Sequence, residues 1–268
     1  VCKHTTTKNV TKITPASFNG DGCVQTSAVC TACGYTKVIS AAKIAKVSAP
    51  KLAKTVYTYN GKVQKPSVTV KDSTGKQLKS GADYTVNYPK GHKAVGRYGV
   101  QVKLKGKYKG SRTVYFTVKP KGTSISKVTG GKKKITVTWK KQTAQTTGYQ
   151  IQYSTSSNFK NAKTVTVSKN STTKKTITGL KNGKKYYVRV RTYKTVKTGR
   201  KSTKYYSSWS KSKTTGTAKK SAPKGNTVYV SPTGKKYHYI KSCAGKHPIK
   251  TTLKEAKKNH TPCKKCAM

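Results

Sequence analysis

The feature that most constrains this fold is an alternation of apolar and basic residues with a period of two. Residues 100–121 read VQVKLKGKYKGSRTVYFTVKPK, with Val, Leu, Tyr or Phe at most of the even-numbered positions and Lys at many of the odd-numbered ones. Such alternation predicts β-strands with one buried face. Hydrophobic residues make up only 32% of the chain, well below the roughly 45–50% of ordinary globular chains. We therefore expect an all-β chain of several small modules with thin cores.

Charge is the second constraint, and it concerns partners rather than fold. Lys and Arg number 59 against four acids, which gives a formal net charge of +55. A lysine on a strand face or edge resists edge-to-edge aggregation and needs no other role. The excess over the whole chain indicates an anionic partner. Nucleic acid, anionic cell-wall polymer, acidic glycan and anionic lipid all qualify.

The chain separates into five stretches by its cysteines and its strand patterns. No run of 18 apolar residues occurs, so we expect no membrane span. No signal peptide is visible at Val1, so we expect a processed mature form or a fragment. The expected parts are a cysteine module at 1–46, strand modules at 47–121 and 122–216, a linker at 217–225 and a second cysteine module at 226–268.

Residues 47–121 predict an immunoglobulin-like sandwich of about six short strands. In TVYTYNGKVQKPSVTV, Asn60-Gly61 predicts a hairpin turn between two strands. Asp72 and Gly75 predict a second turn in VKDSTGKQL. Over residues 50–120, the pattern of Tyr, Gly and Val resembles repeat modules of secreted surface proteins of Gram-positive bacteria.

Residues 122–216 carry a different strand pattern. KKKITVTWKK predicts a strand with Trp139 facing inward, and Leu180 precedes Tyr186 by six residues. This spacing resembles the fibronectin type III domain, and the resemblance implies a Tyr186 hydroxyl bonded back to the chain. We interpret the many tyrosines as core and cross-strand packing, with a stacking platform for bases or sugars as the alternative. These tyrosines are Tyr149, Tyr153, Tyr186, Tyr187 and Tyr193.

The N-terminal cysteine module predicts a structural zinc site. Cys2-x-His4 and Cys30-x2-Cys33 are two short ligand pairs about 25 residues apart, typical of a zinc ribbon in which a hairpin joins the two turns. A segment this small cannot bury a stable hydrophobic core, so a metal ion or a disulfide is expected to hold it together. Cys23 is left over; it is a free thiol, a replacement for Cys2 or His4 as ligand, or the disulfide partner of Cys2. A thioredoxin-like role for CTAC is disfavoured, because no apolar strand precedes it.

The C-terminal module predicts a second zinc site, so we expect up to two zinc ions. Thr252 and Glu255 form a capping-box pattern that starts a helix over 251–259. Pro262 ends the helix, and Cys263-x2-Cys266 follows. His238 and Cys243 are the expected remaining ligands, with His247 and His260 as alternatives to His238. The histidines that bind no metal, and His92 in the loop PKGHKAVG, are expected to be surface imidazoles.

The C-terminal pattern is similar to modules at the ends of secreted Gram-positive proteins, and loosely to the metal-binding domain of the DNA-alkylation repair regulator. In that regulator all four ligands are cysteine and one accepts a methyl group. His238 replaces one cysteine here, so we expect no alkyl transfer.

Catalysis is not expected. Asp21, Asp72 and Asp83 lie in turn sequences and Glu255 in a helix cap, and no two of these acids are close in sequence. Glycosidase chemistry needs two facing carboxylates, and no nucleophile, metalloprotease or phosphate-loop motif occurs. Four protein ligands at each metal site leave no open position for a catalytic zinc.

The sequence therefore favours a non-catalytic, secreted cell-surface protein with a structural or adhesive role. Its lysine-rich faces would bind anionic cell-wall polymer or acidic glycan, and it could assemble into a homopolymeric fibre; the residues that bind the anion are not identified by sequence. One alternative is a nucleic-acid-binding protein, although its basic residues are dispersed and arginine is sparse. Another is the wall- or carbohydrate-targeting region of a secreted hydrolase.

Overall fold

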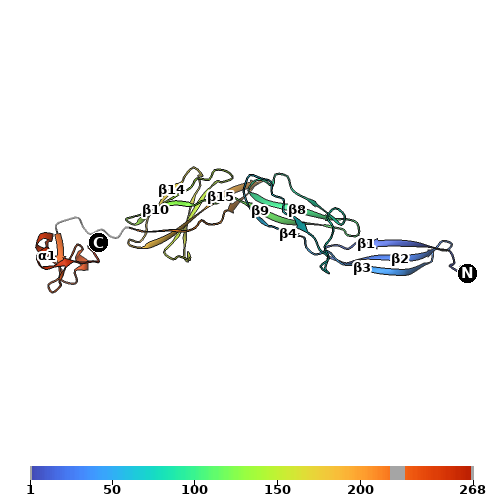
Figure 1. The fold of residues 1–268 in the computed structure, drawn as a ribbon, viewed down its shortest axis with the longest axis horizontal. Coiled ribbons are helices and arrows are strands. Elements are labelled where there is room, and N and C mark those ends of the chain that lie inside the picture. The colour runs from blue at the N-terminus through green and yellow to red at the C-terminus, as the bar shows by residue number, and fades with distance from the viewer. Residues whose placement is uncertain (1, 218–226, 267–268) are drawn as a thin grey trace. The chain divides into compact units, whose positions relative to one another are not determined.

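The computed structural model describes residues 2–217 and 227–266. Strands predominate among these residues, with one short α-helix, so the predicted all-β class is confirmed (Figure 1). The linker expected at 217–225 lies, apart from Thr217, outside the described residues. Two compact units are formed, Val1–Lys121 with Thr143–Thr147 and Thr192–Ser207, and Gly122–Gln142 with Gly148–Arg191 and Ser208–Met268.

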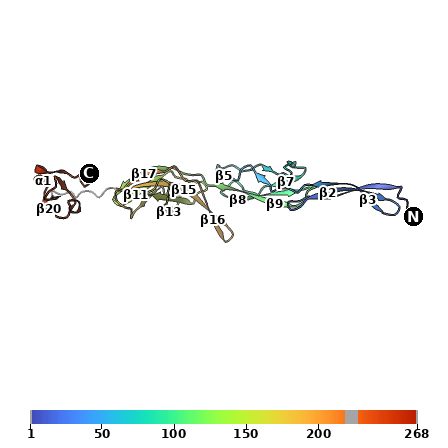
Figure 2. The same ribbon diagram turned by 90° about the horizontal axis from the view of Figure 1, so that it is seen from below.

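The first unit begins with an antiparallel sheet in the order β1 (Thr7–Thr14), β2 (Gly22–Cys30), β3 (Thr36–Ile44). Figures 1 and 2 show this sheet from two sides. All of β1 and nearly all of β3 are exposed, and Val10 and Ile39 remain 45% and 56% exposed. The sheet is therefore a single layer, held by its backbone hydrogen bonds and by the contacts at its two ends.

One end of this sheet merges with the core of the following residues. Ala16 and Ile44 are buried with Val47, Val70 and Tyr108 in one cluster. Backbone bonds reinforce the join, because the Ala16 N–H donates to the Lys107 carbonyl at 3.1 Å. The N-terminal sheet thus rests on the next module instead of enclosing a core of its own.

Residues 47–121 form two sheets. The smaller pairs two strands, and the larger has the order β5-β9-β8-β7. Val100, Phe116 and Val118 are fully buried between them. The strands are β4 (Lys51–Leu52) and β6 (Val68–Thr69) in the smaller sheet, and β5 (Val56–Thr58), β7 (Tyr84–Asn87), β8 (Gly96–Leu104) and β9 (Ser111–Lys119) in the larger.

The hairpin expected at Asn60-Gly61 is wrong. β5 pairs in parallel with β9, whereas β6 pairs with β4 in the other sheet. The flanking strands pair in different sheets, and within the loop between them the Asn60 Oδ1 accepts from the Lys62 N–H at 3.0 Å and from Gln64 Nε2 at 2.8 Å. This local bonding folds a loop that crosses between the sheets. The turn predicted at Asp72 is formed.

The fibronectin-like residues also form two sheets. Trp139 is 2% exposed and packs against Tyr149 and Ile151, which confirms its inward position. Tyr186 closes the predicted corner, since its hydroxyl oxygen accepts the Lys181 N–H at 3.1 Å. One sheet has β10 (Ile125–Gly131), β11 (Lys134–Trp139) and β14 (Lys174–Ile177); the other has β12 (Gly148–Ser154), β13 (Lys163–Val167), β15 (Lys185–Thr198), β16 (Lys201–Tyr206) and β17 (Lys213–Gly216).

The C-terminal module is a small sheet with one helix. The helix α1 (Leu253–Asn259) starts where expected, with Thr252 Oγ1 accepting the Glu255 N–H at 3.2 Å. In a full capping box the Glu255 side chain would also accept the Thr252 N–H. Here the Glu255 carboxylate instead forms an ion pair with Lys258 at 3.2 Å. The other elements are β18 (Thr227–Val230), β19 (Lys236–His238), η1 (Lys241–Cys243), β20 (Ile249–Thr252) and β21 (Thr261–Pro262), with sheet order β20-β18-β19-β21.

Candidate metal centres

The structure brings four side chains together at the free end of the β1–β3 sheet. The ligand atoms of Cys2, His4, Cys30 and Cys33 lie within 4.8 Å of one another. Cys2 Sγ lies 3.4 Å from Cys30 Sγ, and Cys33 Sγ lies 3.2 Å from His4 Nδ1. Thiolates bound tetrahedrally to one zinc ion are about 3.8 Å apart. Three sulfurs and one imidazole nitrogen therefore surround a space that suits tetrahedral zinc.

Local backbone geometry positions this cluster. The β1–β2 pairing sets Thr7 opposite Cys30, so the two ligand pairs meet at the same end of the hairpin. Gly34 adopts a φ of +73°, and its N–H donates to the Cys30 carbonyl at 2.9 Å. This turn reverses the chain beneath Cys33. His4 stacks on Tyr35, with ring centroids 4.5 Å apart, which orients the imidazole.

The cluster electrostatics favour one thiolate. A hydrogen bond with His4, reinforced by the backbone N–H groups of Cys33 and Ala32, lowers the pKa of Cys30 to about 6. A backbone bond from Tyr35 favours the Cys33 thiolate, but burial and the neighbouring sulfurs of Cys2 and Cys30 outweigh it and raise the pKa of Cys33. A thiolate thus disfavours the ionisation of the thiols beside it unless a cation lies between the sulfurs.

Cys23 takes no part in this cluster. It lies at the opposite end of β2 from Cys30, opposite Thr14 and Lys43. Cys23 lies seven positions before Cys30 along the strand, a distance of about 23 Å. The two hypotheses that made Cys23 a ligand or the disulfide partner of Cys2 are therefore wrong, and Cys23 is a free thiol.

A second cluster forms in the C-terminal module. The ligand atoms of His238, Cys243, Cys263 and Cys266 also lie within 4.8 Å of one another. Cys243 Sγ is 3.9 Å from Cys263 Sγ, and Cys266 Sγ is 3.7 Å from His238 Nδ1. Cys263 and Cys266 are buried, at 8% and 3% exposure. This donor set again suits zinc, and it is more enclosed than the first.

The C-terminal sheet and helix deliver these ligands. β19 carries His238, and the Cys263 N–H donates to the Tyr237 carbonyl at 3.0 Å, which holds the two ligand pairs beside each other. The alternative ligands lie elsewhere. His247 is exposed, and His260 ends the helix with its N–H on the Ala256 carbonyl at 2.9 Å.

Burial governs the titration of this second cluster. It raises the pKa of Cys243 to about 11, with the Cys266 and Cys263 sulfurs adding to the effect. Burial and Lys236 lower the pKa of His238, which keeps the imidazole neutral and able to bind a metal. For Cys263, burial is outweighed by hydrogen bonds from the Lys265 N–H and the neighbouring thiols, and its pKa is lowered.

Each of the four acids has a local structural role. Asp21 accepts the Lys46 N–H at 2.7 Å and pairs with Lys43 at 2.8 Å, and Asp83 accepts the Lys79 N–H at 2.8 Å. Asp72 Oδ1 accepts three bonds, from the N–H groups of Thr74 and Lys76 and from the Thr74 hydroxyl.

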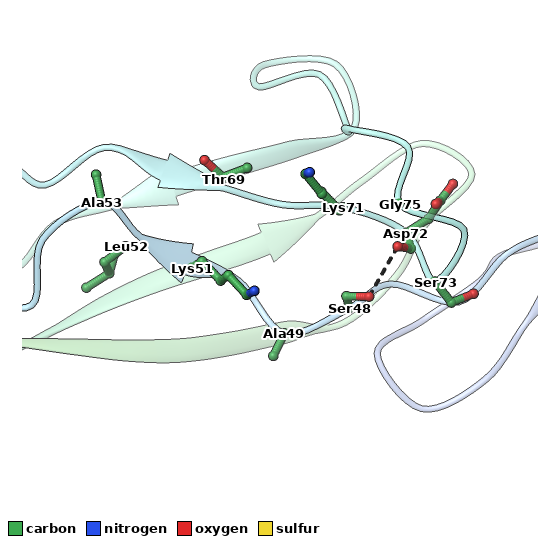
Figure 3. A pocket seen from close by; sticks show the side chains of 10 residues that line it. All are labelled: Ser48, Ala49, Lys51, Leu52, Ala53, Thr69, Lys71, Asp72, Ser73 and Gly75. Carbon is green, nitrogen blue, oxygen red and sulfur yellow. Dashed lines mark hydrogen bonds between the residues drawn. The ribbon is translucent and has the colours of Figure 1, made fainter.

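A hollow of about 470 Å³ adjoins Asp72. Figure 3 shows it beside β4 and β6, with Lys51 and Lys71 among small side chains such as Ala49 and Ala53. The Ser48 hydroxyl donates to the Asp72 carbonyl at 3.2 Å along one side. Asp72 is the sole acid that lines the hollow, so it offers no pair of facing carboxylates.

Sequence reasoning missed a stack of aromatic rings and guanidinium groups on β15. Trp209 lies between two arginines, with the Arg189 and Arg191 guanidinium carbons 5.0 Å and 4.3 Å from its ring. Arg189 also covers Phe159 at 4.0 Å. Gln150 and Gln152 accept bonds from the arginines at 2.7 to 2.9 Å. The sequence does carry a signal for this stack, because Arg189 and Arg191 alternate on one strand and Gln150 and Gln152 alternate on the strand beside it.

His92 is a further correction. The sequence suggested a surface imidazole, yet the side chain is 7% exposed. It lies among the rings of Tyr88, Tyr98 and Phe116, with its Nδ1 bonded to the Pro89 carbonyl. His92 therefore anchors the loop at 88–95 as a core residue.

Comparison with known proteins identifies one domain family in the chain. Residues 118–208 match the fibronectin type III domain family. A search of curated protein sequences gives no match. The FN1–FN3 domains of chicken CNTN1 are 19% identical over 74% of this chain and 78% of that one, with a TM-score of 0.33. A titin segment is 13% identical over 78% and 83% of the two chains, with a TM-score of 0.29.

The described residues thus form a nearly all-β protein of several sheets, with a match to the fibronectin type III domain family at residues 118–208. Cysteine and histidine clusters at both ends can hold metal ions. Over the described residues, no helix has the length and apolarity needed to cross a membrane.

Proposed function

We propose that this chain is a non-catalytic structural or adhesive protein of a bacterial cell surface, whose lysine-rich faces bind anionic cell-wall polymer or acidic glycan. The unmatched positive charge carries this proposal. Four acids face 59 basic residues, and Asp72 and Asp83 are bound to backbone N–H groups within their own turns. The ammonium groups therefore need counter-anions from outside the chain.

The lysines occupy the outward side of the strands. Val102 and Leu104 are buried on β8, while Lys103 and Lys105 beside them are exposed. A polyanion lying along such a face meets a cation at every second residue, about 7 Å apart. The binding is electrostatic, so it weakens as salt shortens the screening length to about 8 Å at physiological ionic strength.

Zinc is the metal that fits both clusters, and its role would be structural. Each site offers four protein donors, three of them sulfur, which completes a tetrahedral shell without an open position. Bound zinc cross-links two turns of the chain. Secretion and a Gram-positive source belong to the same proposal and are supported by the resemblance of residues 50–120 and of the end modules to surface proteins. Assembly into a homopolymeric fibre is a further part of the proposal. Copies of a +55 chain would need counter-anions to assemble.

Binding over a salt series tests the polymer proposal. The intact protein is titrated with anionic wall polysaccharide and with duplex DNA from about 50 to 500 mM salt, and succinylated protein serves as the charge-reversed control. We expect saturable polysaccharide binding that succinylation abolishes. Tight DNA binding above about 200 mM salt without polysaccharide binding would instead identify a nucleic-acid-binding protein.

A further inference from the structure

A second hollow, of about 650 Å³, opens at one edge of the fibronectin domain. β13 is the edge strand of one sheet and β14 the edge strand of the other. The hollow is lined by Lys163 on β13 and by Thr178 just after β14, so it lies where the two sheets are not closed by a strand pair. Its size is within the range of about 300–1,000 Å³ that small-ligand sites occupy.

Three exposed lysines are among the residues that line this hollow: Lys160, Lys163 and Lys181. All four acids of the chain are elsewhere, so no carboxylate neutralises them. Serine, threonine and asparagine residues line the hollow as well, together with Tyr153 and Tyr186. The hollow therefore combines cations, neutral hydrogen-bonding groups and an aromatic surface.

The loop that carries Lys160 is rigidly held. The Ser154 hydroxyl, buried at 6% exposure, donates to the Lys160 carbonyl at 2.8 Å. Asn158 Oδ1 accepts the Lys160 N–H at 2.9 Å. Phe159 and Asn161, on either side, adopt φ values of 61° and 53°; asparagine tolerates this region, whereas it is strained for a bulky residue such as Phe159. Such strain persists only where surrounding bonds enforce it, and it is frequent in ligand clamps.

Lys181 is fixed from the other side. Its N–H donates to the Tyr186 hydroxyl at 3.1 Å, and Tyr186 is itself buried. The backbone of Lys160 and that of Lys181 are thus both held by hydrogen bonds. Lysines that line one hollow with no acidic residue beside them favour the binding of an anion there.

We propose that this hollow binds a sugar unit that carries an oxyanion, either a carboxylate or a phosphate. The lysines would neutralise the oxyanion, the serine, threonine and asparagine groups would bond the sugar hydroxyls, and the Tyr153 ring would pack on the sugar. This inference rests on the proposed function and narrows it, from a diffuse cationic surface to one discrete site in the fibronectin domain.

The test compares two triple variants of the full chain with equal loss of charge. In the first, Lys160, Lys163 and Lys181 become Gln. In the second, three exposed lysines of the same domain that do not line the hollow become Gln: Lys127, Lys132 and Lys140. Each protein is titrated with trigalacturonate, glucose 6-phosphate, triglutamate and the neutral sugar cellotriose at about 150 mM salt. Binding is followed by calorimetry and by backbone amide shifts at 153–163 and 178–181.

We expect at least one acidic sugar to saturate the wild-type protein and to shift those amides. The hollow variant should weaken that affinity by about tenfold or more, and the control variant by about twofold or less. The preference between trigalacturonate and glucose 6-phosphate identifies the oxyanion. Cellotriose should not saturate, and triglutamate should bind more weakly than the acidic sugars.

Equal weakening in both variants, equal binding of triglutamate, or shifts confined to other residues would overturn the site. None of these results would disturb the broader proposal, because polymer binding through dispersed lysines predicts equal weakening. Conversely, wild-type protein that binds no anionic polymer would refute the proposed function. The titration with small sugars would still test the hollow, because its result does not depend on polymer binding.

Discussion

Removing one ligand from each metal cluster is expected to have different consequences at the two ends of the chain. In the C-terminal module, Val228, Val230, Tyr237 and Ala256 are the buried cluster. A core this small rarely contributes more than about 3–5 kcal/mol. Structural zinc contributes about 10–16 kcal/mol in modules of this kind. Cys263→Ser should therefore unfold residues 227–266 as one unit.

The N-terminal cluster holds a sheet that is also anchored elsewhere. Ala16 and Ile44 fix the far end of β1–β3 in the core of the next module, whatever happens to the metal. Cys30→Ser should release the turns that carry Cys2 and Cys33 and fray the strands from that end. Pairing near Thr14, Cys23 and Lys43 should persist.

Hydrogen exchange read by mass spectrometry separates these outcomes, because it reports each segment. We expect full loss of protection over 227–266 for Cys263→Ser, and graded loss along β1–β3 for Cys30→Ser. Zinc content should fall from about two ions per chain to about one in each variant. Cys23→Ser is the matched control, since that thiol lies outside both clusters, and it should change neither readout.

Two results would refute this reasoning. One is a Cys263→Ser protein that retains both its second zinc and its protection over 227–266. The other is a Cys30→Ser protein in which β1–β3 loses protection uniformly, which would mean that the anchored end does not hold by itself. Chelation of the wild-type protein should reproduce both variants together while the two sandwiches stay folded.

Three further predictions concern stability. Asp72→Ala should destabilise the first sandwich by about 1–3 kcal/mol at pH 7, because it leaves backbone donors unpaired. Hydrogen bonds from Thr74 lower the pKa of Asp72 below 3.8, so the stabilisation that the carboxylate provides is present above that pH. Urea titrations should show the difference in stability between variant and wild type shrinking as the pH falls further. Trp209→Ala should cost about 1–3 kcal/mol through the lost cation–π contacts, whereas Trp209→Phe should cost less, as measured by thermal unfolding; equal losses would argue against the stack. Thr252→Ala should lower the stability of the C-terminal module by about 0.5–2 kcal/mol. Glu255→Gln, which removes an exposed ion pair, should change that stability by less than about 1 kcal/mol. A larger loss for Glu255→Gln than for Thr252→Ala in zinc-loaded protein would show that the carboxylate matters more than the cap.

The sequence predicted those features that depend on short-range spacing. Cys30 and Cys33 flank one turn, and a ligand pair at a turn requires only that a hairpin return the chain to the other pair. Trp139 and Tyr186 were predictable because strand alternation fixes which side chains face inward. The Thr252 cap depends on three neighbouring residues and was predicted for the same reason.

The errors arose where tertiary packing chose between local options. Asn60-Gly61 suits a hairpin, but the strands on either side of it belong to different sheets, and no local signal reveals that. His92 looked polar and exposed among lysines, yet three aromatic rings enclose it. Cys23 could be excluded from the cluster only once the register of β2 placed it at the far end of the strand.

The single-layer sheet also determines the order in which metal and structure form. Its two hairpins are local in sequence, and such hairpins form in about 1–10 μs. With one end already seated on Ala16 and Ile44, β1–β3 can pair from that end before any zinc arrives, while the turns that carry Cys2 and Cys33 stay frayed. The C-terminal module would instead fold around its ion. The same metal would thus close the open end of a partly formed sheet at the start of the chain and act as a folding nucleus at its end, so the two sites should fill at different rates from a common zinc pool.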